Sequence, residues 1–288
     1  ASSTRNQQHG GAQVLQSNPV FYIIACQKIR EFSNHQSIID AVREAGAIVR
    51  SADEDKGVKE KSGHQDLVTR YDSAVQRFLE ERLLSLLPEA GFLGEEDAPN
   101  HTEREWVFIV DPIDGTTNFI KGIPIVGISV GLARNGQMEQ GVVYNPYTDE
   151  MFTARRGHGA FCNGKPISVT NNPLADGISF FGTSLYYPEL EDRSFAIAKK
   201  LFESSLDVRR LGAASLDLCY VAAGRGECYF ECSLFPWDYA AGSLILEEAG
   251  GIVTDMTGAP LRFDHRCSMA AANTASHQQL LDLIAGCG

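Results

Sequence analysis

Residues 106–119, WVFIVDPIDGTTNF, are the most informative segment of the chain for its fold. Its apolar run, residues 107–110, contains β-branched side chains and predicts a buried strand. Asp111 and Asp114 follow, and Pro112 between them fixes the backbone φ angle. The Asp-Gly pair is a turn signal, and the Thr-Thr-Asn run after it contains residue types that begin helices. The stretch predicts a strand that ends in a rigid acidic turn, where α/β proteins place anionic ligands.

The spacing of the two aspartates allows two interpretations. They can form an Asx-turn with a helix cap, or they can be metal ligands. Further acidic residues favour the metal interpretation. Converging carboxylates repel one another and raise each other's pKa, and such oxygen-rich clusters suit a hard divalent cation such as magnesium. These additional residues are Asp66, Asp72, Glu95, Glu96, Asp97 and Asp238.

Length and charge limit the classes of protein. The chain has 288 residues, enough for one large domain or two smaller ones. Its net charge of −12 argues against a nucleic-acid surface or an anionic membrane patch as a partner. No apolar run is long enough to span a bilayer. Residues 1–16 are polar, so we expect a flexible tail rather than a signal peptide or a membrane anchor.

The seven cysteines lack any Cys-x-x-Cys pair, which gives no support to a zinc or thioredoxin-like site. Their odd number and scattered positions favour free, mostly buried thiols in a reducing compartment. We therefore expect a cytoplasmic location.

Periodicity and turn signals predict the remaining elements. Pro19 begins a helix that we expect to break near Ser33 and Asn34, and a second helix follows. Asp72 is a candidate N-cap of a helix that ends at Pro88, and Asp238 is a candidate N-cap of another. The expected helices are about 19–32, 36–51, 72–87, 192–204, 211–223, 236–250 and one at the C-terminus. The expected strands are 107–110, 123–132, 141–144, 150–153, 177–181, 228–231, 252–254 and 269–270. Residues 52–63 are expected to form a loop.

Several motifs together resemble the inositol monophosphatase family. Residues 111–119 match its first signature, and Gly94-Glu95-Glu96 matches its Gly-Glu-Glu element. Residues 237–242, followed by 248–251, resemble the second signature. Lys61-Ser62, residues 66–69 and Asp72 resemble an N-terminal element. The likeness extends from about Gln36 to the C-terminus, and the order of the motifs makes it specific.

The resemblance implies a fold and an assembly. The fold would be a layered αβαβα sandwich that divides near residue 172. Residues 1–35 would be a partly helical extension, residues 36–172 would carry most metal ligands, and residues 173–288 would contribute Asp238. Members of the family are typically homodimers.

The resemblance also implies a reaction: magnesium-dependent hydrolysis of inositol monophosphate by a metal-activated water, without a phospho-enzyme. An acidic protein needs local positive charge for this chemistry, and two or three bound magnesium ions would supply it. Glu95, Asp111 and the Ile113 carbonyl would hold the first ion. Asp111, Asp114 and Asp238 would hold the second, and Glu95 with water would hold a weaker third. Lithium sensitivity is a further implied property.

The remaining roles are also implied by the resemblance. Glu95 and Thr116 would orient the water, and Asp72 would accept a hydrogen bond from the Thr116 hydroxyl. Glu96, Asp66 and Lys61 would support the site from behind. Ala213 stands where relatives often carry Thr or Ser, so a hydroxyl contact is lost. The implied contacts to a small phosphorylated polyol are Asp114, Gly115, Thr116, Gly212, Ala213, Ala214, Glu231 and Asp238.

Other functions remain open. Related magnesium phosphatases act on fructose bisphosphate or bisphosphate nucleotides, but they usually have longer insertions between the Glu-Glu element and the Asp-Pro turn. Phosphatases of sugar phosphates and histidinol phosphate share the fold. The alternative from outside the enzymes is a catalytically silent metal-binding scaffold.

Overall fold

The computed structural model describes residues 19–63, 66–96, 102–183 and 187–287; its description of side chains begins at residue 35 and omits residues 62 and 63. The predicted tail at residues 1–16 and the candidate Asp97 lie outside the described residues. No helix within the described part of the chain is long and apolar enough to cross a membrane.

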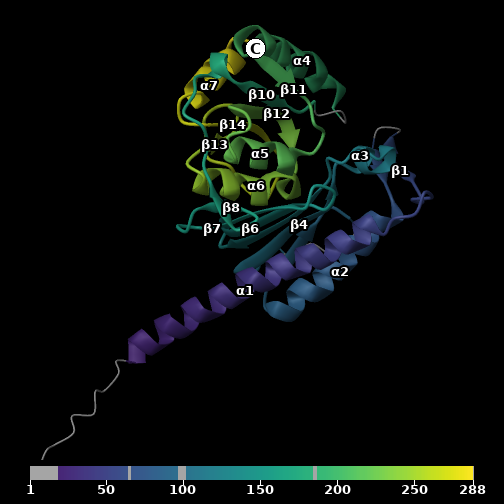
Figure 1. Ribbon diagram of the computed structural model, residues 1–288, viewed down its shortest axis with the longest axis vertical. Coiled ribbons are helices and arrows are strands. Elements are labelled where there is room, and N and C mark those ends of the chain that lie inside the picture. The colour runs from purple at the N-terminus through teal and green to yellow at the C-terminus, as the bar shows by residue number, and fades with distance from the viewer. Residues whose placement is uncertain (1–18, 64–65, 97–101, 184–186, 288) are drawn as a thin grey trace, which may run out of the picture.

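The chain forms five layers in the order αβαβα, which confirms the expected fold (Figure 1). One outer helical layer covers a seven-stranded sheet, two helices fill the space between the sheets, and two more cover the five-stranded sheet. In that order the helices are α1 (Pro19–Arg50) and α2 (Arg70–Leu86), then α5 (Ala214–Ala222) and α6 (Pro236–Glu248), then α4 (Pro188–Ser204) and α7 (His277–Ala285).

The seven-stranded sheet contains β4 (Trp106–Asp114), the strand predicted from the apolar run. Val107 and Ile109 of β4 join the core that contains α5 and α6, whereas Phe108 and Val110 join the core under α1 and α2. The run is continuously apolar because helices cover both faces of the sheet. The sheet order is β3 (Gly91–Gly94), β4, β5 (Gly127–Arg134), β6 (Gln137–Asn145), β7 (Glu150–Arg155), β8 (Ala160–Cys162) and β9 (Lys165–Ile167).

The five-stranded sheet has β12 (Cys228–Leu234) at its centre, between a parallel and an antiparallel neighbour. Its strands come from residues 178–272, and those of the seven-stranded sheet come from residues 91–167. The division near residue 172 stays a proposal. The order is β11 (Asp207–Arg209), β10 (Ile178–Phe181), β12, β14 (Cys267–Ala272) and β13 (Ile252–Thr254).

Two of the local predictions are wrong. The helix break at residues 33–34 is absent, and α1 is continuous over 32 residues. Ser and Asn cost only tenths of a kcal/mol inside a helix, and residues 20–45 around the predicted break include no Gly or Pro that would end it. Residues 52–63 are not all loop, because a hairpin of β1 (Lys59–Gly63) and β2 (Asp66–Val68) begins inside them. Lys59, Glu60 and Lys61 are exposed, so this strand lacks the alternating apolar pattern.

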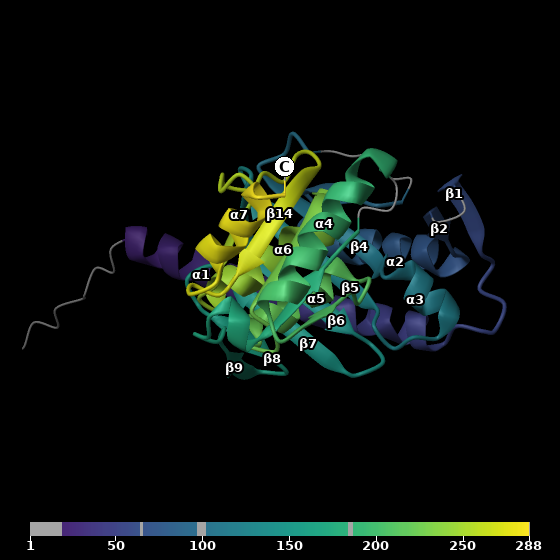
Figure 2. The same cartoon turned by 90° about the horizontal axis from the view of Figure 1, so that it is seen from above.

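The predicted hairpin at residues 141–153 is confirmed, with Tyr144 opposite Met151. Seen from above, the β1–β2 hairpin and the short helix α3 (Thr116–Lys121) lie together at one end of the molecule (Figure 2). The first turns of α1 project from the opposite end. The end of β4 that carries the acidic turn leads directly into α3.

Candidate active site

A cavity of about 520 Å³ brings the predicted site residues together. It lies where the end of β4 and the start of α3 meet the starts of α5 and α6 and the end of β12. All of the predicted site residues line it except Asp72 and Glu96. The lining members are Lys61, Asp66, Glu95, Asp111, Ile113, Asp114, Gly115, Thr116, Gly212, Ala213, Ala214, Glu231 and Asp238.

The acidic turn is an irregular continuation of β4. The strand register shifts between Asp111 and Asp114, and the Ile113 N–H donates to Asp111 Oδ1 at 3.0 Å. Gly115 then adopts a φ of 87°, which favours glycine. A Cβ there would lie 3.0 Å from the Ile125 carbonyl oxygen. Local backbone geometry therefore holds the two aspartates on one side of the strand end.

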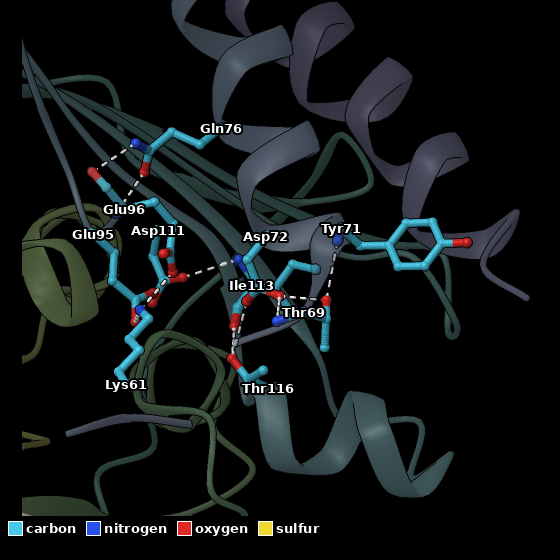
Figure 3. A network of polar contacts seen from close by, with 10 residues as sticks. All are labelled: Lys61, Thr69, Tyr71, Asp72, Gln76, Glu95, Glu96, Asp111, Ile113 and Thr116. Atoms are coloured by element: carbon cyan, nitrogen blue, oxygen red, sulfur yellow. Dashed lines mark hydrogen bonds and ion pairs between the residues drawn. The ribbon is translucent and has the colours of Figure 1, made fainter. Parts of the chain in front are cut away.

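The two carboxylate oxygens of Asp72 have different hydrogen-bond partners (Figure 3). Its Oδ2 accepts from the Thr69 N–H at 2.8 Å and from the Thr69 hydroxyl at 2.5 Å. Its Oδ1 lies 3.2 Å from the Thr116 hydroxyl, which is also 3.0 Å from the Ile113 carbonyl oxygen. The prediction that Asp72 is the N-cap is wrong, because Thr69 is the N-cap and Asp72 completes a capping box three residues later.

Asp114 reaches across to the start of α5. Its Oδ1 accepts from the Ala214 N–H at 3.2 Å, and its Oδ2 accepts from the Ser215 N–H at 2.8 Å and the Ser215 hydroxyl at 2.5 Å. A carboxylate is stable at a helix N-terminus. Burial nevertheless raises the pKa of Asp114 to about 6, against the opposing effect of these hydrogen bonds.

Asp238 lies in the first turn of α6 and is not the N-cap of that helix, which was the less favoured of its two predicted roles. The N-cap is Phe235, whose N–H donates to Asp238 Oδ2 at 2.7 Å. Burial and then repulsion from Asp114 and Glu95 raise the pKa of Asp238 well above its ordinary value. The same causes, with Glu95 as the largest electrostatic contributor, raise the pKa of Asp111.

Lys61 is the cation that contacts the Glu-Glu element (Figure 3). Its Nζ lies 3.1 Å from Glu95 Oε1 and 2.6 Å from Glu96 Oε1. Although burial lowers the pKa of Lys61, the two carboxylates raise it above its usual range. Burial raises the pKa of Glu95 to about 7 even beside this ammonium group. Gln76 fixes the backbone of Glu96 through hydrogen bonds of 2.9 Å to its N–H and its carbonyl.

The donor set is suited to a hard divalent cation, but its present arrangement is not closed around one. The carboxylates of Glu95, Asp111, Asp114 and Asp238 are oxygen ligands that repel one another in a buried site. Among the described residues, however, no three Asp, Glu, His or Cys side chains stand together as a metal site. The carboxylates point instead to Lys61 and to the backbone N–H groups described above.

Several residues that were not predicted from the sequence line the same cavity. Asp217 of α5 is buried, its Oδ1 has no hydrogen-bond partner among the described residues, and burial followed by repulsion from Asp114 raises its pKa. Arg210 lies at the cavity wall and donates from Nε to the Thr183 hydroxyl at 3.0 Å. Tyr229 was detectable, because it stands two residues before Glu231 in a predicted strand and so shares its face.

Glu231 is held in place from two sides. The Tyr229 hydroxyl donates to Glu231 Oε2 at 2.5 Å. Gly182 leaves the space that the carboxylate occupies, since a Cβ at this position would overlap Glu231. Both Tyr229 and Gly182 line the cavity. The orientation of Glu231 therefore depends on a neighbouring strand as well as on its own.

Comparison with known families identifies the class of protein: the chain belongs to the inositol monophosphatase family, whose model matches residues 31–287. An inositol-1-monophosphatase from Rhizobium meliloti is 42% identical over 198 residues, 68% of this chain and 74% of that protein. The Nus factor SuhB of Escherichia coli is 38% identical over 224 residues, 76% of this chain and 84% of that protein.

The solved structure of the extragenic suppressor protein SuhB from Bartonella henselae has the same fold. It superposes with a TM-score of 0.81 at 34% sequence identity, and the match covers 88% of this chain and 98% of that one. Proteins named as enzymes and proteins named as SuhB are thus similarly related to this chain.

Proposed function

We propose that this protein hydrolyses inositol monophosphate to inositol and phosphate with magnesium and without a phospho-enzyme. The observation that carries the proposal is the arrangement around Thr116. Its hydroxyl is held by Asp72, and Thr116 lines the same cavity as Glu95, Asp111 and Asp238. Membership of the inositol monophosphatase family supports the substrate class.

Glu95, Asp111 and the Ile113 carbonyl would hold one magnesium ion, and Asp111, Asp114 and Asp238 would hold a second. A third would bind more weakly at Glu95. When bound, such ions lower the pKa of water and neutralise charge on phosphate oxygens. Because the residues that the structure describes form no closed metal site, we expect binding to turn Glu95 away from Lys61.

The protein's own groups would orient the attacking water. The Thr116 hydroxyl donates its proton toward Asp72 or the Ile113 carbonyl, so its lone pairs are free to accept from water. Glu95 would orient the metal-bound water together with the Thr116 hydroxyl. Asp72 would be a positioning residue that acts through Thr116.

The N–H groups of Gly115 and Thr116 would bind phosphate oxygens at the start of α3. Glu231, Asp114 and the backbone of residues 212–214 would bind the polyol, with Glu96, Asp66 and Lys61 supporting the site. Ala213 offers no hydroxyl, so the contact that Thr or Ser provides in relatives would be absent. We also propose a homodimer in the cytoplasm, as the family resemblance and the free thiols suggest.

The test is phosphate release from inositol 1-phosphate with and without magnesium, beside fructose 1,6-bisphosphate and adenosine 3′,5′-bisphosphate. We expect magnesium-dependent turnover, fastest with the inositol ester. Faster turnover of another ester would indicate a different substrate within the superfamily, which could also be a sugar phosphate or histidinol phosphate. Full activity in excess chelator would contradict the metal assignment.

A second candidate is a binding role without turnover, which the similarity to proteins named Nus factor SuhB favours. In that case the folded protein would hydrolyse none of the esters, although magnesium would still raise its melting temperature. Turnover with any of the esters would exclude a catalytically silent scaffold.

A further inference from the structure

Asp217 is a buried carboxyl group in the cavity wall that the proposed mechanism does not use. It lies in the first turn of α5 and is only 1% exposed, yet it lines the cavity. Its Oδ1 has no hydrogen-bond partner among the described residues. A buried polar atom without a partner is costly, so its position at a cavity wall points to a group that enters from the cavity.

The position of Asp217 in α5 places it beside the groups proposed to bind the polyol. Its N–H donates to the Ala213 carbonyl at 2.9 Å, so Asp217 lies one helical turn after the backbone of residues 212–214. Glu231, also proposed to bind the polyol, is close enough to Asp217 to affect its charge. Both carboxyl groups line the same cavity, on the side proposed for the leaving alcohol.

The surroundings of Asp217 favour its neutral form. Burial is the largest cause that raises its pKa well above the ordinary value, followed by repulsion from Asp114 on β4 and Glu231 on β12. Tyr229 on β12 also faces it, and Arg210, which precedes α5, is the cation that opposes the shift. A metal ion at Asp114 would remove one repulsion but not the burial. The carboxyl group of Asp217 therefore carries an O–H donor near neutral pH.

A polyol hydroxyl is complementary to this pair of groups. A hydroxyl that donates its proton to Glu231 keeps lone pairs, and the O–H of Asp217 can donate to them. An ammonium group has no lone pair and cannot bind in this way. The start of α5 has few other donors to offer, because its first N–H groups already donate to Asp114 and Ala213 has no hydroxyl.

We propose that Asp217 is a specificity-determining residue that donates a hydrogen bond from its carboxyl O–H to a hydroxyl group of the leaving alcohol, while that hydroxyl donates to Glu231. Asp217 thereby favours phosphate monoesters of polyols over esters whose alcohol has no further hydroxyl. Its effect on turnover rests on the proposed phosphatase function, whereas its protonation does not.

The kinetic test compares Asp217→Leu and Asp217→Asn with the unmodified protein. Leucine is similar in size and has no donor, so Asp217→Leu should raise KM for inositol 1-phosphate by about 2- to 12-fold, the range for one lost neutral hydrogen bond, with little change in kcat. Asparagine keeps an N–H donor, so Asp217→Asn should leave KM close to that of the unmodified protein. Inhibition by inorganic phosphate, which lacks the alcohol, should not change in either variant.

Asp192→Leu on the exposed face of α4 is the matched control and should alter neither constant. An unchanged KM in folded Asp217→Leu would overturn the proposal. So would a KM raised equally in Asp217→Asn, or a phosphate inhibition constant that rises as much as KM.

A measurement of protonation separates this proposal from failure of the proposed function. Carbon-13 NMR of protein labelled at the aspartate carboxyl carbons, compared with the spectrum of Asp217→Asn, assigns the Asp217 signal. With magnesium present, we expect the signal of a neutral carboxyl group near neutral pH. A charged Asp217 would refute the donor role, whether or not the protein hydrolyses any ester. A neutral Asp217 in a protein without turnover would support the donor and contradict the proposed function instead.

Discussion

At the scale of single residues, the candidate site contains buried carboxylates whose charged forms lower the stability of the metal-free protein. Asp111 is 2% exposed and lies near other carboxylates, so its charged form is destabilised in the metal-free protein. Such groups persist where a function requires them, and their replacement commonly stabilises a protein while removing activity.

We predict that Asp111→Asn stabilises the metal-free protein by about 0.5–2 kcal/mol and abolishes magnesium-dependent turnover. Asparagine keeps the acceptor for the Ile113 N–H and removes the repulsion. Thermal unfolding in chelator, together with phosphate release in magnesium, measures both effects. Asp192→Asn on exposed α4 is the control and should alter neither. Normal turnover in folded Asp111→Asn would refute the metal assignment.

Gly182 gives a second prediction at this scale. Gly182→Ala should displace Glu231 and raise KM for inositol 1-phosphate by about tenfold or more, the scale of a lost hydrogen bond to a charged group, with a smaller effect on kcat. In a Glu231→Ala background the same substitution should change KM little, because the two residues act together. Gly286→Ala, whose Cβ would meet only ordinary contacts, is the control. Additive effects of the two substitutions would contradict the positioning role.

At the scale of elements, the first turn of α2 serves both the helix and the site. Thr69 and Asp72 form the capping box, and the second oxygen of Asp72 faces Thr116 at the start of α3. The first turn of α2 thus places a hydrogen-bond acceptor, the second oxygen of Asp72, in the candidate site.

Substitutions at Thr69 and Thr116 should separate these two tasks. Thr69→Ala removes the cap and should cost about 0.5–2 kcal/mol of stability while kcat changes only a few-fold. Thr116→Val should lower kcat by at least about 100-fold, the scale of a lost group that positions a reacting proton, with little loss of stability. Chemical denaturation and steady-state kinetics on both variants distinguish the two effects. An unchanged kcat in Thr116→Val would remove Thr116 from the mechanism.

At the scale of the whole molecule, the cavity lies at the junction of the two sheets. Asp114 extends from the seven-stranded sheet to the N-terminus of α5, the helix packed against the five-stranded sheet. Buried carboxylates at this junction make the stability of the entire fold sensitive to protons and to metal ions.

The metal-free protein should lose stability as pH rises from about 4.5 to about 7. The pKa of Glu95 is raised from 4.5 to about 7 and that of Asp114 from 3.8 to about 6. In this window the folded state therefore binds more protons than the unfolded state, and the contribution of these groups to the unfolding free energy falls with pH. Melting temperatures in chelator across this range measure it.

Magnesium should reverse that trend. A bound cation favours the charged carboxylates, so the melting temperature in magnesium should rise relative to the chelator curve most strongly near neutral pH. Glu95→Gln removes one of the two groups and should flatten the slope in chelator. A melting temperature in chelator that rises through the same window would contradict the pKa directions.

Local patterns in the chain predicted much of the fold. The apolar run before the acidic turn, the strand pairs at residues 141–153 and the helix that begins at Pro236 follow from neighbours in sequence. The helix break at residues 33–34 and the Asp72 cap were wrong because Ser, Asn and Asp have several local uses that propensity does not separate.

The acidic turn, most of the elements and the set of carboxylates could be predicted from the sequence, because each depends on residues a few positions apart. The hydrogen-bond and ion-pair partners of these carboxylates follow from the tertiary structure alone. Ser215 binds Asp114 across 101 positions, and Lys61 pairs with Glu95 across 34. Such contacts follow from the packing of the two sheets around α5 and α6, and no local pattern specifies them.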